Sequence, residues 1–151
     1  MAVEKGSLTF VFDQNLGSRI VELLKIAKMQ PDGGITTLTE LGFAANAPDE
    51  DWMPALGSRG RYVVVTRDGA ILRAAVRLEA WKASQLILLI LDGSWGQLPI
   101  SGLIRALIYW WPLMVDEADA APPGTAWTVP HTVPAPHKSI RLITPKLGRS
   151  I

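Results

Sequence analysis

The fold is decided by a short apolar run, Tyr62-Val63-Val64-Val65-Thr66-Arg67, which ends at Asp68. A second run, Leu8-Thr9-Phe10-Val11-Phe12, ends in the same way at Asp13. Both runs are short, continuous and rich in β-branched and aromatic residues, which is typical of buried strands in a parallel sheet. A carboxylate just past such a strand lies in the crevice outside the strand's carboxyl end, where α/β sheets bind ligands. The two runs therefore predict the fold class and the place of the site together.

Strand-like and helix-like patterns alternate along most of the chain. The expected strands cover residues 8–12, 35–38, 62–67 and 86–91. Helical spacing of apolar residues follows the strand at residues 8–12, and a short helix is expected to start at Asp49. Longer helices are expected at residues 70–83 and 100–114. This order predicts an α/β fold, a single domain with a central, mostly parallel sheet flanked by helices.

The last thirty residues break this alternation. Residues 120–124 read Ala-Ala-Pro-Pro-Gly, and four further prolines follow at intervals too short for helices. We therefore expect one domain over residues 1–119 and a Pro-rich C-terminal extension over residues 120–151. Residues 127–129 and 140–143 are expected to be extended pieces that lie along the domain or form edge strands.

Size and composition limit the class of protein. A chain of 151 residues is the size of one ordinary domain and can enclose a core. Its 48% hydrophobic and 19% charged residues favour a folded protein over a disordered one. The net charge of +1 excludes the global basic field of a dedicated nucleic-acid binder. Any contact with RNA must therefore depend on a local patch.

The absence of cysteine excludes disulfides, thiolate zinc sites and cysteine nucleophiles. Residues 1–6 lack the basic start and long apolar core of a signal peptide. The longest apolar stretches, residues 86–91 and 103–111, are too short or too interrupted to span a bilayer. We therefore expect a cytoplasmic protein that does not act at a membrane.

Three acidic residues are the best functional candidates. Asp13 and Asp68 follow different strands, and Asp49 begins the acidic helix start Asp49-Glu50-Asp51-Trp52. Converging carboxylates of this kind suit Mg²⁺ or Mn²⁺, which prefer oxygen ligands and need only a few of them. The residues alone leave a second interpretation open, in which Asp13 and Asp68 form caps or turns and the acids from Asp49 match a helix dipole.

The same positions resemble a known family. Residues 10–16, with Asp13 and Asn15 after a strand, look like the opening of PIN-like domains. Residues 47–52 resemble their central acidic helix start, and residues 63–68 resemble their strand that ends in Thr-x-Asp. Order and spacing are similar to those of short PIN-like proteins akin to VapC toxins. The resemblance covers roughly residues 8–115 and fits the tail less clearly.

By that resemblance the protein is a Mg²⁺- or Mn²⁺-dependent endoribonuclease, with Asp13, Asp49 and Asp68 as catalytic metal ligands. The resemblance also implies that Asn15 and Thr66 support the cluster by hydrogen bonding. Many PIN domains carry a fourth acid, for which Asp51 and Asp92 are the main candidates here and Glu40 a weaker one. An RNA substrate and an antitoxin partner follow from the same resemblance, since the short subgroup consists of toxins.

Basic and aromatic residues supply candidates for contacts with partners. Arg67 and Arg73 lie around the run that ends at Asp68 and are candidates for binding RNA phosphates, although ordinary surface arginines would look the same. Trp110 and Trp111 are adjacent in a helix, so their side chains point about 100° apart. Either one is exposed at an interface, for which a homodimer is one candidate, or both pack and the tail covers one of them.

Two other functions compete with the nuclease. The first is a PIN-like binding or scaffold module without catalysis, which we expect if the three acids point apart or are paired with basic residues. The second is a receiver-like phosphotransfer domain. It needs a second acid beside Asp13 and a lysine after a late strand, and the sequence shows neither.

Overall fold

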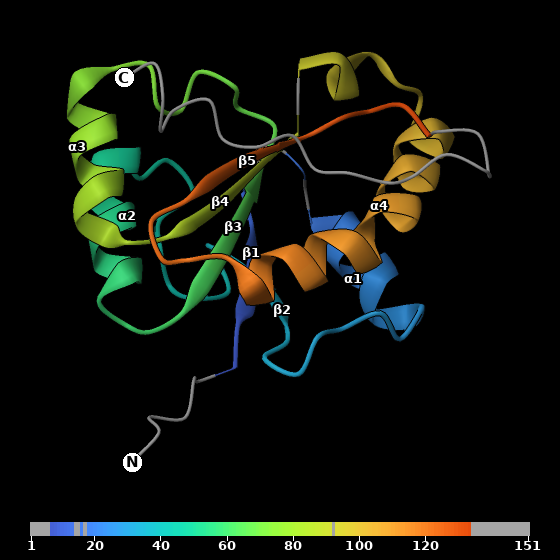
Figure 1. The fold of residues 1–151 in the computed structure, drawn as a ribbon, viewed down its shortest axis with the longest axis horizontal. Coiled ribbons are helices and arrows are strands. Elements are labelled where there is room, and N and C mark those ends of the chain that lie inside the picture. Colours follow the sequence, from blue (N-terminus) through green and yellow to red (C-terminus); the bar gives the residue numbers. More distant parts are fainter. Residues whose placement is uncertain (1–6, 14–15, 17, 92, 134–151) are drawn as a thin grey trace.

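A computed structural model describes residues 7–13, 16, 18–91 and 93–133 of the chain (Figure 1). At its centre is a five-stranded parallel sheet with the strand order β2-β1-β3-β4-β5. The strands are β1 (Thr9–Phe12), β2 (Ile35–Thr37), β3 (Tyr62–Thr66), β4 (Ile87–Leu91) and β5 (Ala126–Val129). The helices are α1 (Ser18–Ile26), α2 (Asp49–Gly57), α3 (Ala75–Ser84), the 3₁₀ helix η2 (Gly93–Gln97) and α4 (Ile100–Ala120). The predicted α/β class with a mostly parallel sheet is confirmed.

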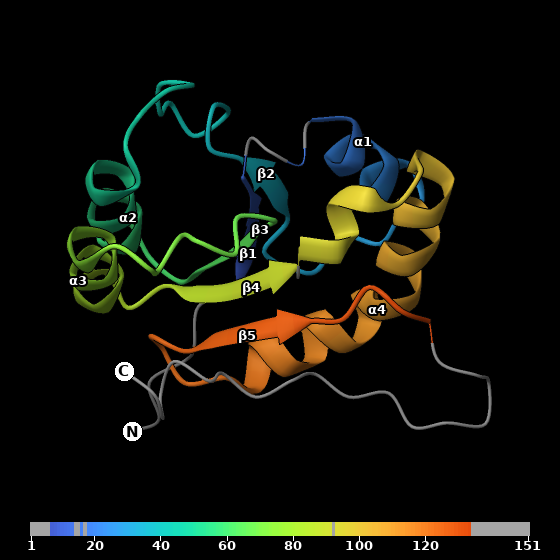
Figure 2. The ribbon, with the colours of Figure 1, turned by 90° about the horizontal axis from the view of Figure 1, so that it is seen from above.

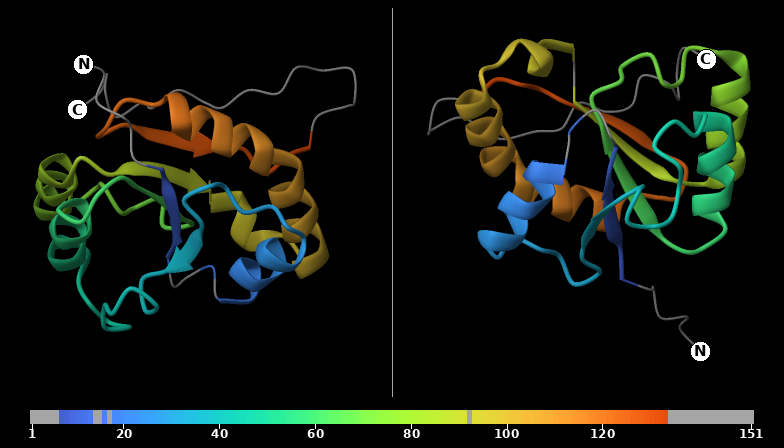
Figure 3. Two further views of the ribbon diagram at one scale, coloured as in Figure 1. Left: turned by 90° about the horizontal axis from the view of Figure 1, so that it is seen from below. Right: turned by 180° about the vertical axis from the view of Figure 1, so that it is seen from behind.

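Helices cover both faces of the sheet. Helices α1 and α4 lie on one face, and α2 and α3 lie on the other (Figures 1 and 3). Successive side chains of a strand point to opposite faces, so each strand contributes to two cores. Phe10 and Phe12 belong to the core beneath α1 and α4, whereas Val11 belongs to the core beneath α2 and α3. This two-sided burial explains why the strands read as continuous apolar runs.

The strand order places a change of direction between β1 and β3. The chain runs from β1 outward to β2 and then crosses back past β1 to form β3, which pairs with β1 on its other side (Figure 2). In open α/β sheets such a switch point leaves a crevice at the carboxyl ends of the strands, and ligands bind there. The acids that follow β1 and β3 are therefore at the position where this topology forms a site.

One expected helix begins later than its sequence pattern indicates. The pattern predicts a helix from residue 70, but α3 starts at Ala75. Residues 69–73 form turns instead, in which the Asp68 Oδ1 accepts the Ala70 N–H at 2.9 Å. Ile71 and Leu72 are buried in this turn, beneath α2 and α3. Burial of these two side chains therefore outweighs their helical preference.

The segment after α4 completes the sheet. Residues 126–129, within the expected C-terminal extension, form β5 and pair in parallel with β4, with Ala126 opposite Leu88. Trp110 and Trp111 are both buried, and the Trp110 indole donates to the Thr132 carbonyl at 3.1 Å. Of the two alternatives for these tryptophans, the packed one is correct, because the chain after β5 covers Trp110. In the described part of the chain, no helix combines the length and apolarity needed to cross a bilayer.

Replacing Gly57 by alanine is expected to destabilise the protein by about 1–3 kcal/mol. Gly57 ends α2 against the end of α3, and a Cβ there would lie 2.9 Å from the Ser84 Cα and nearer still to its carbonyl oxygen. Without that clash, alanine would favour the helix. The matched control is Gly96→Ala, where a Cβ meets nothing within 4 Å. Urea unfolding of both variants checks this, and equal midpoints would contradict the close approach of α2 to α3.

Candidate functional site

Asp13 and Thr66 are brought together by the register of the sheet. Phe12 of β1 lies opposite Val65 of β3, so the next residues of the two strands are also neighbours. The Asp13 N–H donates to the Val65 carbonyl at 2.9 Å, which continues the pairing by one residue. The Thr66 hydroxyl then donates to the Asp13 Oδ2 at 2.9 Å.

Thr66 connects the ends of both strands. Its side chain is fully buried, and its hydroxyl oxygen accepts the backbone N–H of Asp68 at 3.0 Å while its proton is donated to Asp13. A hydroxyl with its single proton directed at a carboxylate holds that carboxylate in one orientation. Buried polar groups without partners are costly, so this arrangement also fixes the turn that carries Asp68.

Asp68 uses one carboxylate oxygen for its own turn and presents the other outward. Its Oδ1 accepts the Ala70 N–H at 2.9 Å, and its Oδ2 lies 4.0 Å from the Arg77 Nη1. About a third of the Asp68 side chain is exposed. The hydrogen bond to Ala70 therefore fixes one oxygen, and the other oxygen is the one nearest Arg77.

Asp49 is arranged in the same way at the start of α2. It is the first residue of α2, and its Oδ1 accepts the Trp52 indole N–H at 3.0 Å. Its Oδ2 lies 3.7 Å from the Arg77 Nη1. Asp49 and Asp68 thus each have one oxygen held by a local hydrogen bond and one oxygen beside the same guanidinium.

Arg77 is the residue of the site that sequence reasoning missed. It is the third residue of α3, and a cation in the first turn of a helix is opposed by the positive end of the helix dipole. The two carboxylates compensate that unfavourable position. The sequence pattern predicted a helix from residue 70, which put Arg77 in the middle of that helix. A positive charge in the middle of a helix does not indicate a functional residue. With the true start of α3 at Ala75, a basic residue in the first turn of the helix would have indicated that acidic partners lie nearby.

The other expected site residues differ in their exposure and partners. Arg67 is half-buried beside Asp68, whereas Arg73 and Asp51 are exposed. Glu40 accepts the Thr36 hydroxyl at 3.0 Å and lies 3.9 Å from the Lys25 Nζ, so it is engaged with α1 and β2. Asn15 and Asp92 lie outside the described residues.

The donor set suits a hard divalent cation, since every candidate ligand is a carboxylate oxygen. Among residues 7–13, 16, 18–91 and 93–133, however, no three His, Cys, Asp or Glu side chains are arranged to hold an ion. Asp13 and Asp68 are connected through Thr66, and Asp49 and Asp68 are paired with Arg77. One guanidinium therefore offsets part of the negative charge of Asp49 and Asp68.

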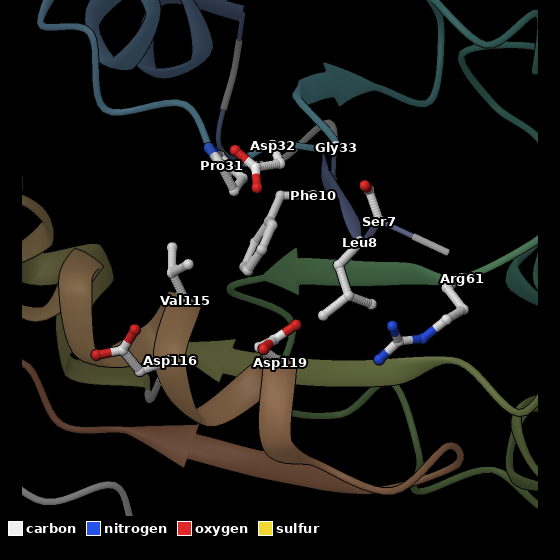
Figure 4. Close-up of a pocket in the computed structure, with 10 residues that line it drawn as sticks. All are labelled: Ser7, Leu8, Phe10, Pro31, Asp32, Gly33, Arg61, Val115, Asp116 and Asp119. Atoms are coloured by element: carbon white, nitrogen blue, oxygen red, sulfur yellow. The ribbon is translucent and has the colours of Figure 1, made fainter. Parts of the chain in front are cut away.

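A pocket of about 480 Å³ lies at the opposite end of the sheet, where the strands begin (Figure 4). Its floor includes Phe10, and the side chains of Arg61 and Asp119 extend toward each other from facing sides. Asp32 and Asp116 also line it, but these acids are not arranged to hold an ion in the described structure. None of the predicted site residues lines this pocket. It is therefore separate from the group formed by Asp13, Asp49, Thr66, Asp68 and Arg77, which we call the carboxylate edge.

Comparison with known families gave one match. A family model described as "PIN like domain" matches residues 8–93, which is more than half of the 151-residue chain. The match includes every residue of the carboxylate edge described above, namely Asp13, Asp49, Thr66, Asp68 and Arg77. Comparisons with curated proteins and with solved structures gave no match.

Proposed function

Because this chain belongs to the PIN-like domain family, we propose that it is a metal-dependent endoribonuclease that hydrolyses RNA phosphodiester bonds. The observation that carries the proposal is the chain of hydrogen bonds from Asp13 through Thr66 to Asp68 at the switch point of the sheet. Carboxylates at this place in the topology have the right chemistry for a phosphate and its cation.

Asp13, Asp49 and Asp68 would hold Mg²⁺ or Mn²⁺, and Thr66 orients the first of them. Asp51 and Asp92 are the candidates for a fourth ligand, and Asn15 is a candidate for a further hydrogen bond. When bound, the metal supplies an activated water, orients the phosphate and offsets the charge that builds on its oxygens. Arg67 and Arg73 are the local cations for RNA phosphates, which a chain of net charge +1 needs.

We further propose that the protein is the toxin of a toxin–antitoxin pair in the cytoplasm. The support is the order and spacing of the three acidic motifs, which resemble those of short VapC-like proteins. An antitoxin that covers the carboxylate edge would inhibit cleavage directly.

One observation favours a second function, a PIN-like binding or scaffold module without catalysis. Asp49 and Asp68 are paired with Arg77, and the described carboxylates form no three-ligand cluster. A PIN-like domain that had lost its metal would look like this. The two functions differ in whether a divalent cation changes what the protein does to RNA.

The deciding experiment is to incubate the purified protein with structured RNA in Mg²⁺, in Mn²⁺ and in EDTA. Cleavage in either metal that EDTA abolishes is expected, and Asp68→Asn is expected to remove most of it. Asp116→Asn, which removes an acid at the opposite end of the sheet, is the control for charge. Intact RNA with wild-type protein in both metals would support the binding module, provided that the protein is folded by circular dichroism.

Replacing Thr66 by valine is expected to lower cleavage about 10- to 100-fold. Valine keeps the buried shape of Thr66 but leaves the Asp13 Oδ2 and the Asp68 N–H without their shared partner. Thr66→Ser retains the hydroxyl and should keep activity within a few-fold of wild type. Initial rates with a fluorescent RNA measure both. Equal losses in the two variants would assign Thr66 a packing role instead of an orienting one.

A further inference from the structure

Arg77 lies between two carboxylates that the proposed reaction needs for its metal. We infer that Arg77 is a built-in counter-ion, which a divalent cation must displace from Asp49 and Asp68 before the site is active. This inference rests on the proposed function, since it concerns the metal of the same site. It makes metal affinity depend on competition with a residue of the protein itself.

The distances indicate that the pairing is exchangeable. The Arg77 Nη1 lies 3.7 Å from Asp49 and 4.0 Å from Asp68, longer than the roughly 2.7–2.9 Å of a charged hydrogen bond. All three side chains are between a fifth and two-fifths exposed. Ion pairs of this kind are weak, since water screens them and two flexible ends must be ordered. A single guanidinium therefore offsets part of the charge of the two carboxylates and is held only weakly.

The carboxylates remain oriented when the guanidinium leaves. The Trp52 indole holds the Asp49 Oδ1, and the Ala70 N–H holds the Asp68 Oδ1. Trp52 is buried and therefore a rigid donor. The oxygens that face Arg77 are the ones left for another cation. A divalent ion at these oxygens would repel the guanidinium, so the two cations exclude each other.

The position of Arg77 in α3 favours its release. A cation at the start of a helix is held there only by its acidic partners, because the helix dipole opposes it. A metal that neutralises Asp49 and Asp68 removes that attraction. Arg77 then rotates away on its own side chain, and α3 does not have to move. The displaced state therefore differs from the described one by a side-chain change.

The test is calorimetric titration of the purified protein with Mn²⁺ in the absence of RNA. Arg77→Gln is expected to bind Mn²⁺ about three- to ten-fold more tightly than wild type, because the metal no longer has to break two weak ion pairs. Arg105→Gln removes an exposed positive charge from α4, on the other face of the sheet, and is expected to stay within about two-fold. Arg77→Lys keeps a competing cation and should stay near wild type. Tb³⁺ luminescence excited through tryptophan gives a second reading of occupancy.

The outcomes separate the two proposals. If wild type and Arg77→Gln bind Mn²⁺ equally, or the variant binds more weakly, Arg77 is no competitor, and the nuclease proposal is untouched. If neither protein binds Mn²⁺, the counter-ion inference and the metal-dependent nuclease both fail. Thermal unfolding of each variant checks that it is folded, because Arg77 also joins α3 to α2. Should Arg77→Gln unfold, Arg77→Met keeps the aliphatic stem and serves as the charge-free variant.

Discussion

Replacing Asp13 by asparagine is expected to lower the rate of metal-dependent RNA cleavage by more than about 100-fold. Loss of a residue that merely supports a metal ligand costs about 10- to 100-fold, so loss of the ligand charge costs more. Asparagine keeps an oxygen that accepts the Thr66 hydroxyl, and the backbone bond to Val65 is unaffected. The change therefore removes a negative charge and leaves the local structure in place.

Initial rates at saturating Mg²⁺ with a fluorescent RNA measure this effect. Asp32→Asn is the matched control, since it removes the same charge from an exposed loop at the opposite end of the sheet. The control is expected to cleave within about two-fold of wild type. If Asp13→Asn cleaves as fast as Asp32→Asn, the proposed centre at the switch point is wrong, whatever metal the reaction uses.

Replacing Trp111 by alanine is expected to destabilise the protein by about 3–5 kcal/mol, the usual cost of removing a buried aromatic side chain. Trp111 is 2% exposed, and its ring centroid lies 4.9 Å from that of Phe10 and 5.7 Å from that of Phe12. Its indole N–H also donates to the Met29 carbonyl at 2.7 Å. One side chain thus joins α4 to β1 and to the chain after α1.

Urea unfolding, followed by far-UV circular dichroism, measures the loss. The free energy of unfolding of a domain is about 5–15 kcal/mol in total, so Trp111→Ala should unfold at a much lower urea concentration than wild type. Trp111→Phe keeps an aromatic ring but lacks the indole N–H. Its free energy of unfolding is expected to fall by about 1–3 kcal/mol, because the Met29 carbonyl no longer has this donor. Ile108→Ala, at a position that is 41% exposed, is the surface control. A midpoint for Trp111→Ala close to that of Ile108→Ala would contradict the packing.

Most of the sheet was predictable because strand signals are local. Burial on both faces requires apolar side chains along most of β3 and all of β4, and this composition is visible in the sequence itself. The acids after β1 and β3 were predictable for the same reason, since they mark where the apolar runs end. The closeness of Asp13 and Thr66 then follows from the parallel register that joins Phe12 to Val65.

The sequence predicted an extended piece at residues 127–129, either along the domain or as an edge strand, and these residues lie in the edge strand β5. Residues 126–129 are few, follow several prolines and glycine, and carry no helix of their own toward a later strand. They join the sheet because β4 offers an unpaired edge and Val129 accepts the Trp95 indole at 3.0 Å. That partner is 34 residues away in the chain. The local pattern predicts extended chain but does not choose between an edge strand and a segment that only lies along the domain.

By itself, the sequence determined the fold class, the strands and the acids at their carboxyl ends, because each depends on residues adjacent in the chain. Only the tertiary structure decided that Asp49 and Asp68 share Arg77. That contact requires α3 to start at Ala75, and the start depends on burial of Ile71 and Leu72 against α2 and the sheet. A helix boundary set by long-range packing therefore placed a cation at the candidate site, and periodicity within α3 does not encode it.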